Sequence, residues 1–136
     1  MTKEPAARRV VAITGAGGAL GAAVSRRLAS EPDTALVLSD LSQESLTATL
    51  DGLGEGHGPT ATMLADVSDP AQVEAVVQDA VARFGRLDVL VSNAGVLAPN
   101  GRIHNLTTED WERCFRINVL GAVNGIRAAV AVMRPQ

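Results

Sequence analysis

The feature that most constrains the fold of this chain is a series of four short apolar runs along its sequence. They occupy residues 9–14, 34–40, 60–66 and 87–93. None of the runs shows the regular alternation of apolar and polar residues that marks a strand with one face in water. Runs of this kind are typical of buried strands, so they predict a parallel sheet that is covered by helices on both faces.

Helical patterns separate these runs, and the clearest covers residues 70–84. Its apolar residues recur at helical spacing and are Val73, Val76, Val77, Ala80, Val81 and Phe84. Asp69 is placed to cap this helix, with Pro70 at its first position and Gly85 just beyond its end. The pattern therefore predicts a complete helix that packs its apolar face on the sheet.

Three further helical patterns complete the alternation. Between the first two runs, four apolar residues are expected to pack on the sheet, namely Leu20, Ala23, Val24 and Leu28. Residues 42–53 form a weaker pattern that opens at Ser42 and ends at a glycine-rich turn. The last pattern, at 107–133, is apolar on most sides near its end, which implies either burial or a partner.

The alternation of strands and helices restricts the topology, because such crossovers are right-handed. A first strand in the middle of the sheet gives the strand order 3-2-1-4. We therefore expect one three-layer, doubly wound α/β domain over residues 1–136, with residues 1–8 as a flexible tail and an end before a fifth strand. Ligands of such sheets bind beyond the carboxyl ends of the strands, where the strand order reverses, which is here between the first and fourth strands.

The composition argues against several classes of protein. The formal net charge is −3 and the arginines are scattered, so no basic stripe is available for nucleic acid. The apolar stretches are shorter than the roughly 20 residues of a membrane helix, and no signal-peptide core precedes the first strand. Cys114 is the only cysteine, which excludes an internal disulfide and a cysteine metal site, and it is expected to be a buried helix residue. These features indicate a cytoplasmic protein.

Residues 14–21, TGAGGALG, carry almost no side-chain bulk at the turn from the first strand into the first helix. A phosphate group needs main-chain N–H donors at a helix start, and side chains on the turn would hold it away. Gly15 is expected to take the sharp exit from the strand. Gly17 and Gly18 would allow close approach, and Gly21 would let the helix lie tight on the sheet.

This glycine turn favours a dinucleotide over a nucleoside triphosphate. A triphosphate-binding loop needs a lysine directly after its last glycine, and Ala22 stands there. A plain tight connection between strand and helix would have the same composition, so the turn alone does not decide between a binding site and a structural turn.

Asp40 ends the second run, about 20 residues after Gly21, which is the separation at which an acid meets the adenosine ribose hydroxyls. The alternative is a loop acid or a cap for the helix that begins near Ser42. A carboxylate here would repel a 2′-phosphate, and neither the glycine turn nor Leu41 offers an arginine to hold one. NAD is therefore favoured over NADP.

Four motifs together resemble the short-chain dehydrogenase/reductase family. They are TGAGGALG at 14–21, ADV at 65–67, NAG at 93–95 and RINVLG at 116–121, and they span nearly the whole chain. The resemblance implies a Rossmann-type domain that binds a nicotinamide dinucleotide between the glycine turn and the NAG segment. The activity that it implies is hydride transfer between this cofactor and an alcohol or carbonyl substrate.

Position by position, the resemblance implies a set of cofactor-binding residues. They are Gly15, Gly17, Gly18, Ala19, Leu20, Gly21, Asp40, Leu41, Asp66, Val67, Asn93, Ala94 and Gly95. Asp66 is expected to contact the adenine amino group, Val67 to line the adenine pocket and Asn93 to brace the fourth strand. The alternative for Asp66 is a cap for the helix that begins near Pro70, and the alternative for NAG is a generic turn. Ala19 stands where the family has a glycine, which places a methyl group near the pyrophosphate.

Only one catalytic position of the family is matched, and it is Asn118, which in this family helps to carry protons to the active centre. The other catalytic groups are a tyrosine, a lysine four residues later and an upstream serine, whereas this chain has no tyrosine and only one lysine, Lys3. We therefore expect an oxidoreductase that is represented by its cofactor-binding half and is inactive by itself. The alternatives are a non-catalytic dinucleotide-binding module or pseudoenzyme, and an S-adenosylmethionine-binding fold, against which the motifs argue.

The remaining conspicuous residues have structural interpretations. His57 and His104 lie in polar turns and are expected on the surface, and Ser92 is expected to pack because spacing places no histidine or acid beside it. Trp111 is expected to anchor the last helix by packing, and the alternative is a role in an interface. The fourth strand would form an apolar edge, so we expect self-association through it or through the apolar face of residues 126–133.

Overall fold

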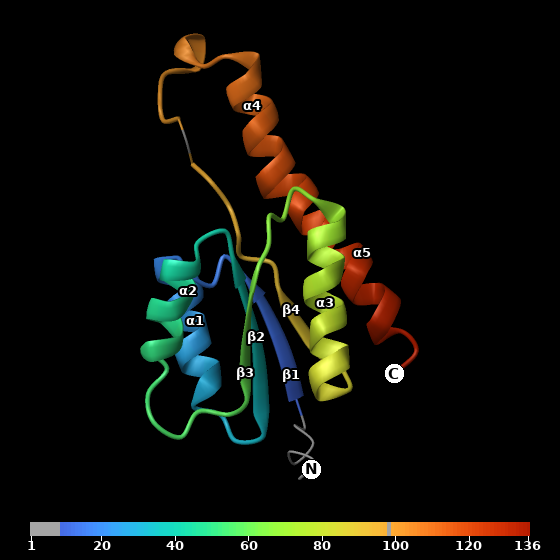
Figure 1. Ribbon diagram of the computed structural model, residues 1–136. Coiled ribbons are helices and arrows are strands. Elements are labelled where there is room, and N and C mark those ends of the chain that lie inside the picture. Colours follow the sequence, from blue (N-terminus) through green and yellow to red (C-terminus); the bar gives the residue numbers. More distant parts are fainter. Residues whose placement is uncertain (1–8, 98) are drawn as a thin grey trace.

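The computed structural model describes residues 9–97 and 99–136 (Figure 1). Lys3 and the proposed tail at residues 1–8 lie outside this range. Parallel strands form one four-stranded sheet in the order β3-β2-β1-β4. The predicted strand order and the doubly wound α/β architecture are confirmed, and the order reverses between β1 and β4.

The four strands differ in length. β1 (Arg9–Thr14) pairs with β2 (Thr34–Asp40) along its whole length. β3 (Thr60–Leu64) extends the sheet beyond β2, and β4 (Val89–Val91) pairs with the other side of β1. The predicted third strand, 60–66, therefore extended two residues too far at its carboxyl end. The predicted fourth strand, 87–93, extended two residues too far at each end.

Side chains of β1 and of the segment before β4 take part in hydrogen bonds at both ends of the short fourth strand. The N–H groups of Asn93 and Ala94 donate to Thr14 Oγ1, at 3.1 and 3.2 Å. At the opposite end, the Val10 N–H donates to Asp88 Oδ2 at 2.8 Å, while the Asp88 N–H still donates to Val10 O at 2.9 Å. The backbone ladder therefore stops inside the apolar run at its carboxyl end.

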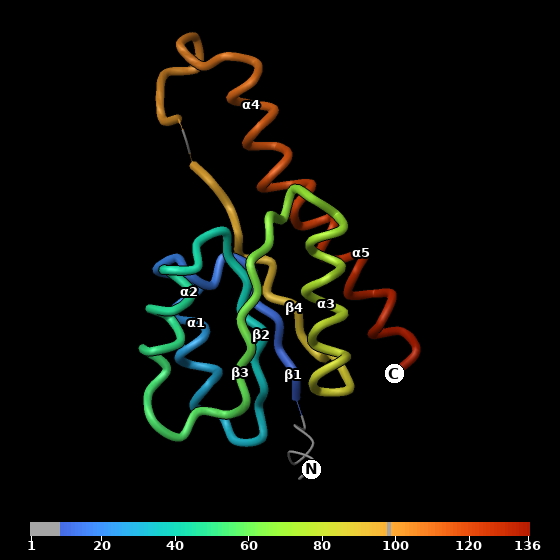
Figure 2. Tube along the Cα trace, in the orientation of Figure 1, coloured from blue at the N-terminus to red at the C-terminus, as the bar shows by residue number. Residues whose placement is uncertain are grey.

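Helices cover both faces of the sheet, as Figures 1 and 2 show. α1 (Ala19–Ala29) and α2 (Gln43–Asp51) lie on one face, and α3 (Pro70–Phe84) and α5 (Gly121–Met133) lie on the other. The buried core beside α1 and α2 consists of Val11, Ile13, Ala16, Ala29, Leu36, Leu38 and Leu46. The core on the other face consists of Val10, Ala12, Ala35, Val37, Ala65, Val76, Val77, Ala80, Leu87 and Ala129. The three-layer prediction is confirmed.

The inner face of α1 is only partly the predicted one. Val24 and Leu28 pack against the buried core on this side of the sheet, as expected, but the other two predicted residues do not. Leu20 is 68% exposed, and Ala23 is exposed as well. The buried positions of the helix hold small residues, namely Gly21, Ser25 and Ala29. Small side chains let α1 lie close to the sheet, and the Ser25 hydroxyl is satisfied locally because it donates to Gly21 O at 2.7 Å.

The predicted ends of α3 are confirmed. Asp69 Oδ1 accepts the Ala71 N–H at 3.0 Å, and Pro70 is the first residue of the helix. Gly85 ends it with a φ of 82°. These signals can be read from the sequence because a helix leaves N–H and C=O groups unpaired at its ends, and only a few residue types satisfy them.

The predicted helix at 107–133 is helical throughout but changes its winding. It consists of α4 (Thr108–Phe115), a π-helical segment η2 (Arg116–Leu120) and then α5. A short 3₁₀ turn, η1 (Ile103–Asn105), precedes it. A capping box between Thr107 and Asp110 fixes its start. α5 packs beside α3, whereas α4 extends beyond the sheet (Figure 1).

The position of α4 corrects two predictions. Trp111 is 53% exposed, so it does not anchor the helix by packing in the part of the chain that the structure describes. Cys114 lies in the helix as expected but is half-buried instead of buried. Both differences arise because α5 packs on the sheet, whereas α4 extends beyond it and has no strand among the described residues to cover its side chains.

The segment Thr108–Met133, 26 residues long, has the length and the mean hydropathy of a membrane-spanning helix. By these two criteria, the expectation that every apolar stretch is too short to span a membrane was wrong. They are weak grounds for a membrane helix, because a core helix of a soluble protein meets them too. In α5 one side is packed against protein, at Gly121, Gly125 and Ala129.

Candidate functional site

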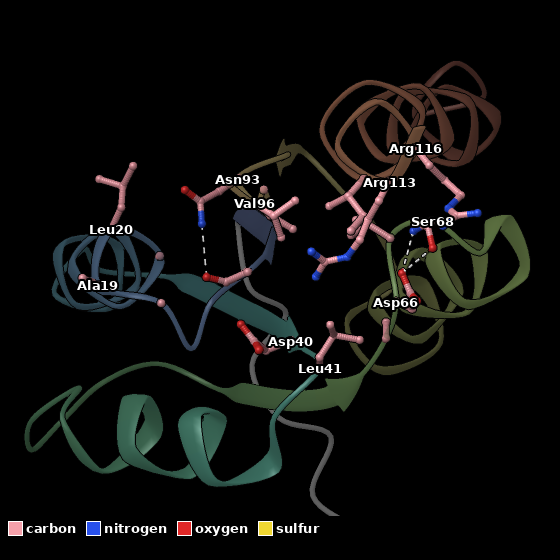
Figure 3. A pocket seen from close by; sticks show the side chains of 18 residues that line it. Ala19, Leu20, Asp40, Leu41, Asp66, Ser68, Asn93, Val96, Arg113 and Arg116 are labelled. Carbon is pink, nitrogen blue, oxygen red and sulfur yellow. Dashed lines mark hydrogen bonds between the residues drawn. The ribbon is translucent and has the colours of Figure 1, made fainter. Parts of the chain in front are cut away.

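A pocket of about 600 Å³ lies at the carboxyl ends of the strands, at the predicted reversal of strand order (Figure 3). All predicted cofactor-binding residues except Gly17 line it. Further lining residues are Ala65, Ser68, Val96, Arg113, Arg116 and Ile117. The fold thus brings segments that are far apart in the sequence to one site.

Gly15 makes the exit from β1 with a φ of 65°, a backbone conformation that favours glycine. A Cβ atom at Gly15 would lie 2.8 Å from Ala94 Cα. Asn93 Nδ2 donates to the carbonyl oxygens of Thr14 and Gly15, both at 3.1 Å. Main-chain contact therefore holds the two sides of the pocket together.

The other glycines of the turn do not all have the predicted roles. A Cβ atom at Gly17 would lie 2.5 Å from Ser45 Cβ, so this glycine lets the turn pack on α2. A Cβ atom at Gly21 would overlap Gly15 O, so Gly21 lets the start of α1 lie tight against the backbone that leaves β1. Gly18 is open, because its nearest neighbour is Gly15 O at 3.5 Å.

The N-terminus of α1 is the part of the turn that is available to a phosphate. The N–H groups of residues 16–18 all donate within the protein, to Ser39 O, Asp40 Oδ2 and Gly15 O. By contrast, the first three N–H groups of the helix have no acceptor among residues 9–97 and 99–136, and they belong to Ala19, Leu20 and Gly21. Because Gly18 gives the helix no side-chain cap, these donors can receive an anion.

Asp40 ends β2 with its carboxylate against the glycine turn. Oδ2 accepts the Gly17 N–H at 2.9 Å, and Oδ1 accepts the Ser42 N–H at 3.1 Å. The cap of α2 is Ser42, so the alternative of Asp40 as that cap does not apply. Each carboxylate oxygen can accept a second hydrogen bond, so Asp40 can still bind hydroxyl groups at the pocket, beside the exposed Leu41.

Asp66 follows β3 and is held by Ser68. Its Oδ1 accepts both the Ser68 hydroxyl, at 2.7 Å, and the Ser68 N–H, at 2.8 Å. These two bonds and the charge of Arg116 lower the pKa of Asp66 below its ordinary value, against the opposing effect of partial burial. The cap of α3 is Asp69, so the alternative of Asp66 as that cap does not apply. Asp66 Oδ2 accepts no hydrogen bond from the described residues.

Replacing Ser68 with alanine is expected to raise the pKa of Asp66, because the hydroxyl bond is the largest cause of its lowering. A folded-state pKa below the unfolded one stabilises the fold above the unfolded pKa, about 3.9, and this contribution is lost as the pH falls through the folded pKa. The Ser68→Ala variant should lose about 1 kcal/mol of unfolding free energy near pH 7 and little of it near pH 2. NMR titration of Asp66 and urea unfolding at several pH values measure the two effects.

A matched control for this variant is Ser30→Ala. The Ser30 hydroxyl donates to Arg27 O at the exposed end of α1, at 2.8 Å. Any cost of this change should not depend on pH. If the cost of Ser68→Ala were also the same at pH 7 and pH 2, the interaction assigned to Asp66 would be wrong.

Residues 93–95, the NAG segment, form the wall of the pocket opposite the glycine turn. The segment is tied to β1 through Thr14, as described above, and it also contacts the long helix. A Cβ atom at Gly95 would lie 3.3 Å from Asn118 Oδ1. The segment is thus a brace between β1 and the long helix, and a role in holding a cofactor stays a prediction.

Asn118 lies in η2, and both ends of its amide bind the backbone of Val96. The Val96 N–H donates to Oδ1, and Nδ2 donates to Val96 O, both at 2.8 Å. π-helical turns are frequent at functional sites. Here the contact positions the segment after β4, and the proton-carrying role that the resemblance implies stays a prediction.

Two arginines of the long helix were missing from the predicted site. In Figure 3, Arg113 extends into the pocket and Arg116 lies beside Ser68. The expectation that no arginine is available rested on the glycine turn and position 41 alone, whereas the structure supplies two arginines from a third element. The one available signal was that these arginines and Ile117 are three and four residues apart, which is the spacing of one helical face.

The other polar residues considered in the sequence are His57, His104 and Ser92, and none of them lines the pocket. His57 and His104 are exposed, as predicted. Ser92 is exposed too, so the expectation that it packs is wrong. Over residues 9–97 and 99–136, no three histidine, cysteine, aspartate or glutamate side chains gather in a way that could hold a metal ion.

The fold and the pocket together are those of a Rossmann-type domain, the class in which dinucleotides bind where the strand order reverses. The sequence profile of the short chain dehydrogenase family matches residues 9–136. The chain belongs to this family of oxidoreductases.

Individual relatives agree with this assignment. Levodione reductase of Leifsonia aquatica is 39% identical, over 99% of this chain and 52% of the relative. The crystal structure of levodione reductase has a TM-score of 0.89 at 38% identity, over 94% of this chain and 50% of that chain. The crystal structure of NAD⁺-bound xylitol dehydrogenase has a TM-score of 0.88 at 32% identity, over 94% of this chain and 49% of that chain. The chain therefore spans about half the length of the relatives that it matches.

Proposed function

We propose that this chain binds NAD and is the cofactor-binding part of an oxidoreductase that transfers hydride between nicotinamide and an alcohol or carbonyl substrate. The observation that carries the proposal is the convergence of the α1 N-terminus with two fixed carboxylates, Asp40 and Asp66, in one pocket. A helix N-terminus suits a diphosphate, whereas carboxylates suit ribose hydroxyls and an amino group.

The pocket fits a dinucleotide in its size and its hydrogen-bonding groups. Its volume of about 600 Å³ lies within the range of small-molecule sites, about 300–1,000 Å³. The N–H groups of residues 19–21 would hold the diphosphate, Asp40 the ribose, and Asp66 with Val67 the adenine. Bound NAD supplies the hydride acceptor, and the residues of this chain bind and orient it. Ala19 lies at the pocket surface as the first residue of α1.

NAD is preferred over NADP in this proposal, because two N–H groups fix the Asp40 carboxylate at the pocket, where it would meet the ribose and repel a 2′-phosphate. The relative xylitol dehydrogenase has been crystallised with NAD⁺. Arg113 and Arg116 offset part of the negative charge of the pocket. We therefore expect weaker binding of NADP and not its complete exclusion.

The family resemblance implies that a tyrosine and a lysine take part in proton transfer to the substrate, and this sequence lacks both at the implied positions. It has no tyrosine, and its one lysine is Lys3. We therefore expect cofactor binding without turnover by this chain alone. A non-catalytic dinucleotide-binding module is not favoured as the function, since the named relatives are a reductase and a dehydrogenase. A cytoplasmic location stays an expectation.

Calorimetric titration with NAD, NADP and S-adenosylmethionine tests the cofactor proposal. We expect NAD to bind most tightly and S-adenosylmethionine not to compete with it. Tighter binding of S-adenosylmethionine, or a folded protein that does not bind NAD, would overturn the proposal. An absorbance assay of NAD reduction over a panel of alcohols should show no turnover, and turnover at ordinary enzyme rates would disprove the expected inactivity.

Self-association through the long helix is the second expectation for this chain. Exposed apolar side chains form a stripe along α4, η2 and α5, and we call Trp111, Phe115, Val119, Val123, Ile126 and Val130 the apolar stripe. Burying one such side chain contributes about 1.5–3 kcal/mol. Ile126→Asp, in the predicted face of residues 126–133, should therefore weaken self-association at least tenfold. Sedimentation equilibrium measures the change.

Gln78→Asp is the matched control, because Gln78 is exposed on α3, a helix that carries no residue of the apolar stripe, and the change adds the same charge. This variant should associate like the unaltered protein. The edge strand β4, with Val89 37% exposed, is the other predicted route. Self-association that survives Ile126→Asp would favour β4, and a monomer at high concentration would exclude both routes.

A further inference from the structure

Arg116 lines the pocket from a helix whose register is fixed against the segment after β3. A Cβ atom at Gly121 would lie 2.7 Å from Val67 Cγ2, so the helix backbone touches Val67 with no side chain between them. Asn124 Nδ2 donates to Val67 O at 3.0 Å. These two contacts prevent the helix from sliding or turning relative to Val67, so the residues one turn before Gly121 have a defined place.

Arg116 stands one π-helical turn before Gly121, whose N–H donates to Arg116 O. Its side chain extends toward residues 66–68, and Figure 3 shows it beside Ser68. The guanidinium is exposed and forms no ion pair or hydrogen bond with the residues that the structure describes. Its charge helps to lower the pKa of Asp66, so the two opposite charges lie on the same side of the pocket.

The surroundings of Arg116 restrict the kind of group that can bind there. Asp66 Oδ2 is free to accept a hydrogen bond, and Val67 offers apolar surface. A guanidinium binds either an anion or the face of an aromatic ring. An anion at this place would be repelled by the Asp66 carboxylate. A neutral aromatic base with an amino group meets all three conditions, because its edge donates to the carboxylate while its face meets the guanidinium.

We propose that Arg116 binds the adenine ring of the dinucleotide by stacking its guanidinium on the base, and that it thereby closes the adenine end of the pocket. This inference rests on the proposed function, because NAD brings the base. The π-helical winding of η2 contributes to the position of Arg116. A π-turn holds one more residue than an α-turn, so it rotates α4 and Arg116 relative to α5, which stays locked on Val67.

Calorimetric titration of Arg116→Ala with NAD tests the proposal. The dissociation constant is expected to rise about 5- to 20-fold, which is the range of a partly desolvated contact between a cation and an aromatic ring. Arg116→Gln keeps the length of the side chain but removes its charge, and it should lose as much affinity. Arg116→Lys should lose less. Arg127→Ala removes an exposed arginine of α5 outside the pocket and should bind NAD like the unaltered protein.

ADP-ribose, which keeps the adenine and lacks the nicotinamide, is the second titrant. Arg116→Ala should raise the dissociation constants of NAD and of ADP-ribose by the same factor. A loss for NAD alone would overturn the inference, because it would place Arg116 at the nicotinamide end. Unchanged NAD binding by folded Arg116→Ala and Arg116→Gln would also overturn it and leave the proposed function intact. If the unaltered protein bound neither titrant, the proposed function and this inference would fail together.

Discussion

Gly15→Ala is expected to lower the free energy of unfolding by about 3 kcal/mol, because the new Cβ atom would strain the backbone of residue 15 and crowd its contact with Ala94. The φ of 65° at this position disfavours any residue with a Cβ atom. That atom would also lie 2.8 Å from Ala94 Cα, and a main-chain neighbour cannot move aside as a flexible side chain can. The midpoint of thermal unfolding should fall by about 10 °C. NAD binding should be lost as well, because the contact joins the two sides of the pocket.

Gly18→Ala is the matched control for Gly15→Ala, since it makes the same chemical change three residues further along the turn. A Cβ atom at Gly18 meets only Gly15 O, at an ordinary distance of 3.5 Å. Calorimetric and urea unfolding should therefore give nearly unchanged stability for this variant. Equal stability losses in the two variants would mean that the close approach of Gly15 to Ala94 does not hold the turn.

Asp40→Asn is expected to weaken NAD binding about 10- to 100-fold, because a hydrogen bond to a charged group contributes about 1.5–3 kcal/mol and the ribose would lose a charged acceptor. The change keeps the volume of the side chain and an oxygen that can accept the Gly17 N–H. Removal of the negative charge should at the same time reduce the repulsion of a 2′-phosphate. The ratio of the NADP and NAD dissociation constants, measured by calorimetry, should therefore fall.

Asp79→Asn controls for the loss of a carboxylate elsewhere. Asp79 pairs with Arg83 along α3, with a shortest distance of 2.7 Å, and lies outside the pocket. This variant should bind NAD and NADP like the unaltered protein. An Asp40→Asn variant that is fully folded and has an unchanged ratio of the two constants would remove the basis for the preference for NAD.

Local sequence signals predicted much of the fold. The apolar runs located all four strands, because a strand buried on both faces must be apolar throughout. Asp69, Pro70 and Gly85 located the ends of α3, because capping depends on neighbouring residues alone. The strand order followed from the alternation of elements and the handedness of their connections.

The failed predictions concern contacts between elements. Helical periodicity suggested that Leu20 packs on the sheet, yet the close approach of α1 buries its small residues and leaves Leu20 at the pocket. Trp111 was expected to pack because it is large and apolar, but α4 extends beyond the sheet. Gly17 was assigned to the ligand, and its missing side chain serves the contact with Ser45. Periodicity and composition identify a helix and its apolar residues, but they carry no information on how closely the next layer approaches.

The sequence by itself determined the order of the elements and the glycine turn, Asp40, Asp66 and residues 93–95 as candidates for one site, because strand ends, caps and turns depend on nearby residues. The tertiary structure alone decided which N–H groups of the turn lack an acceptor among the described residues, namely the first three of α1, and that Arg113 and Arg116 join the pocket. The side of the long helix that faces the pocket depends on η2 and on the contact between Gly121 and Val67. These residues are more than 50 positions apart in the chain, and only the packing of α5 on the sheet brings them together.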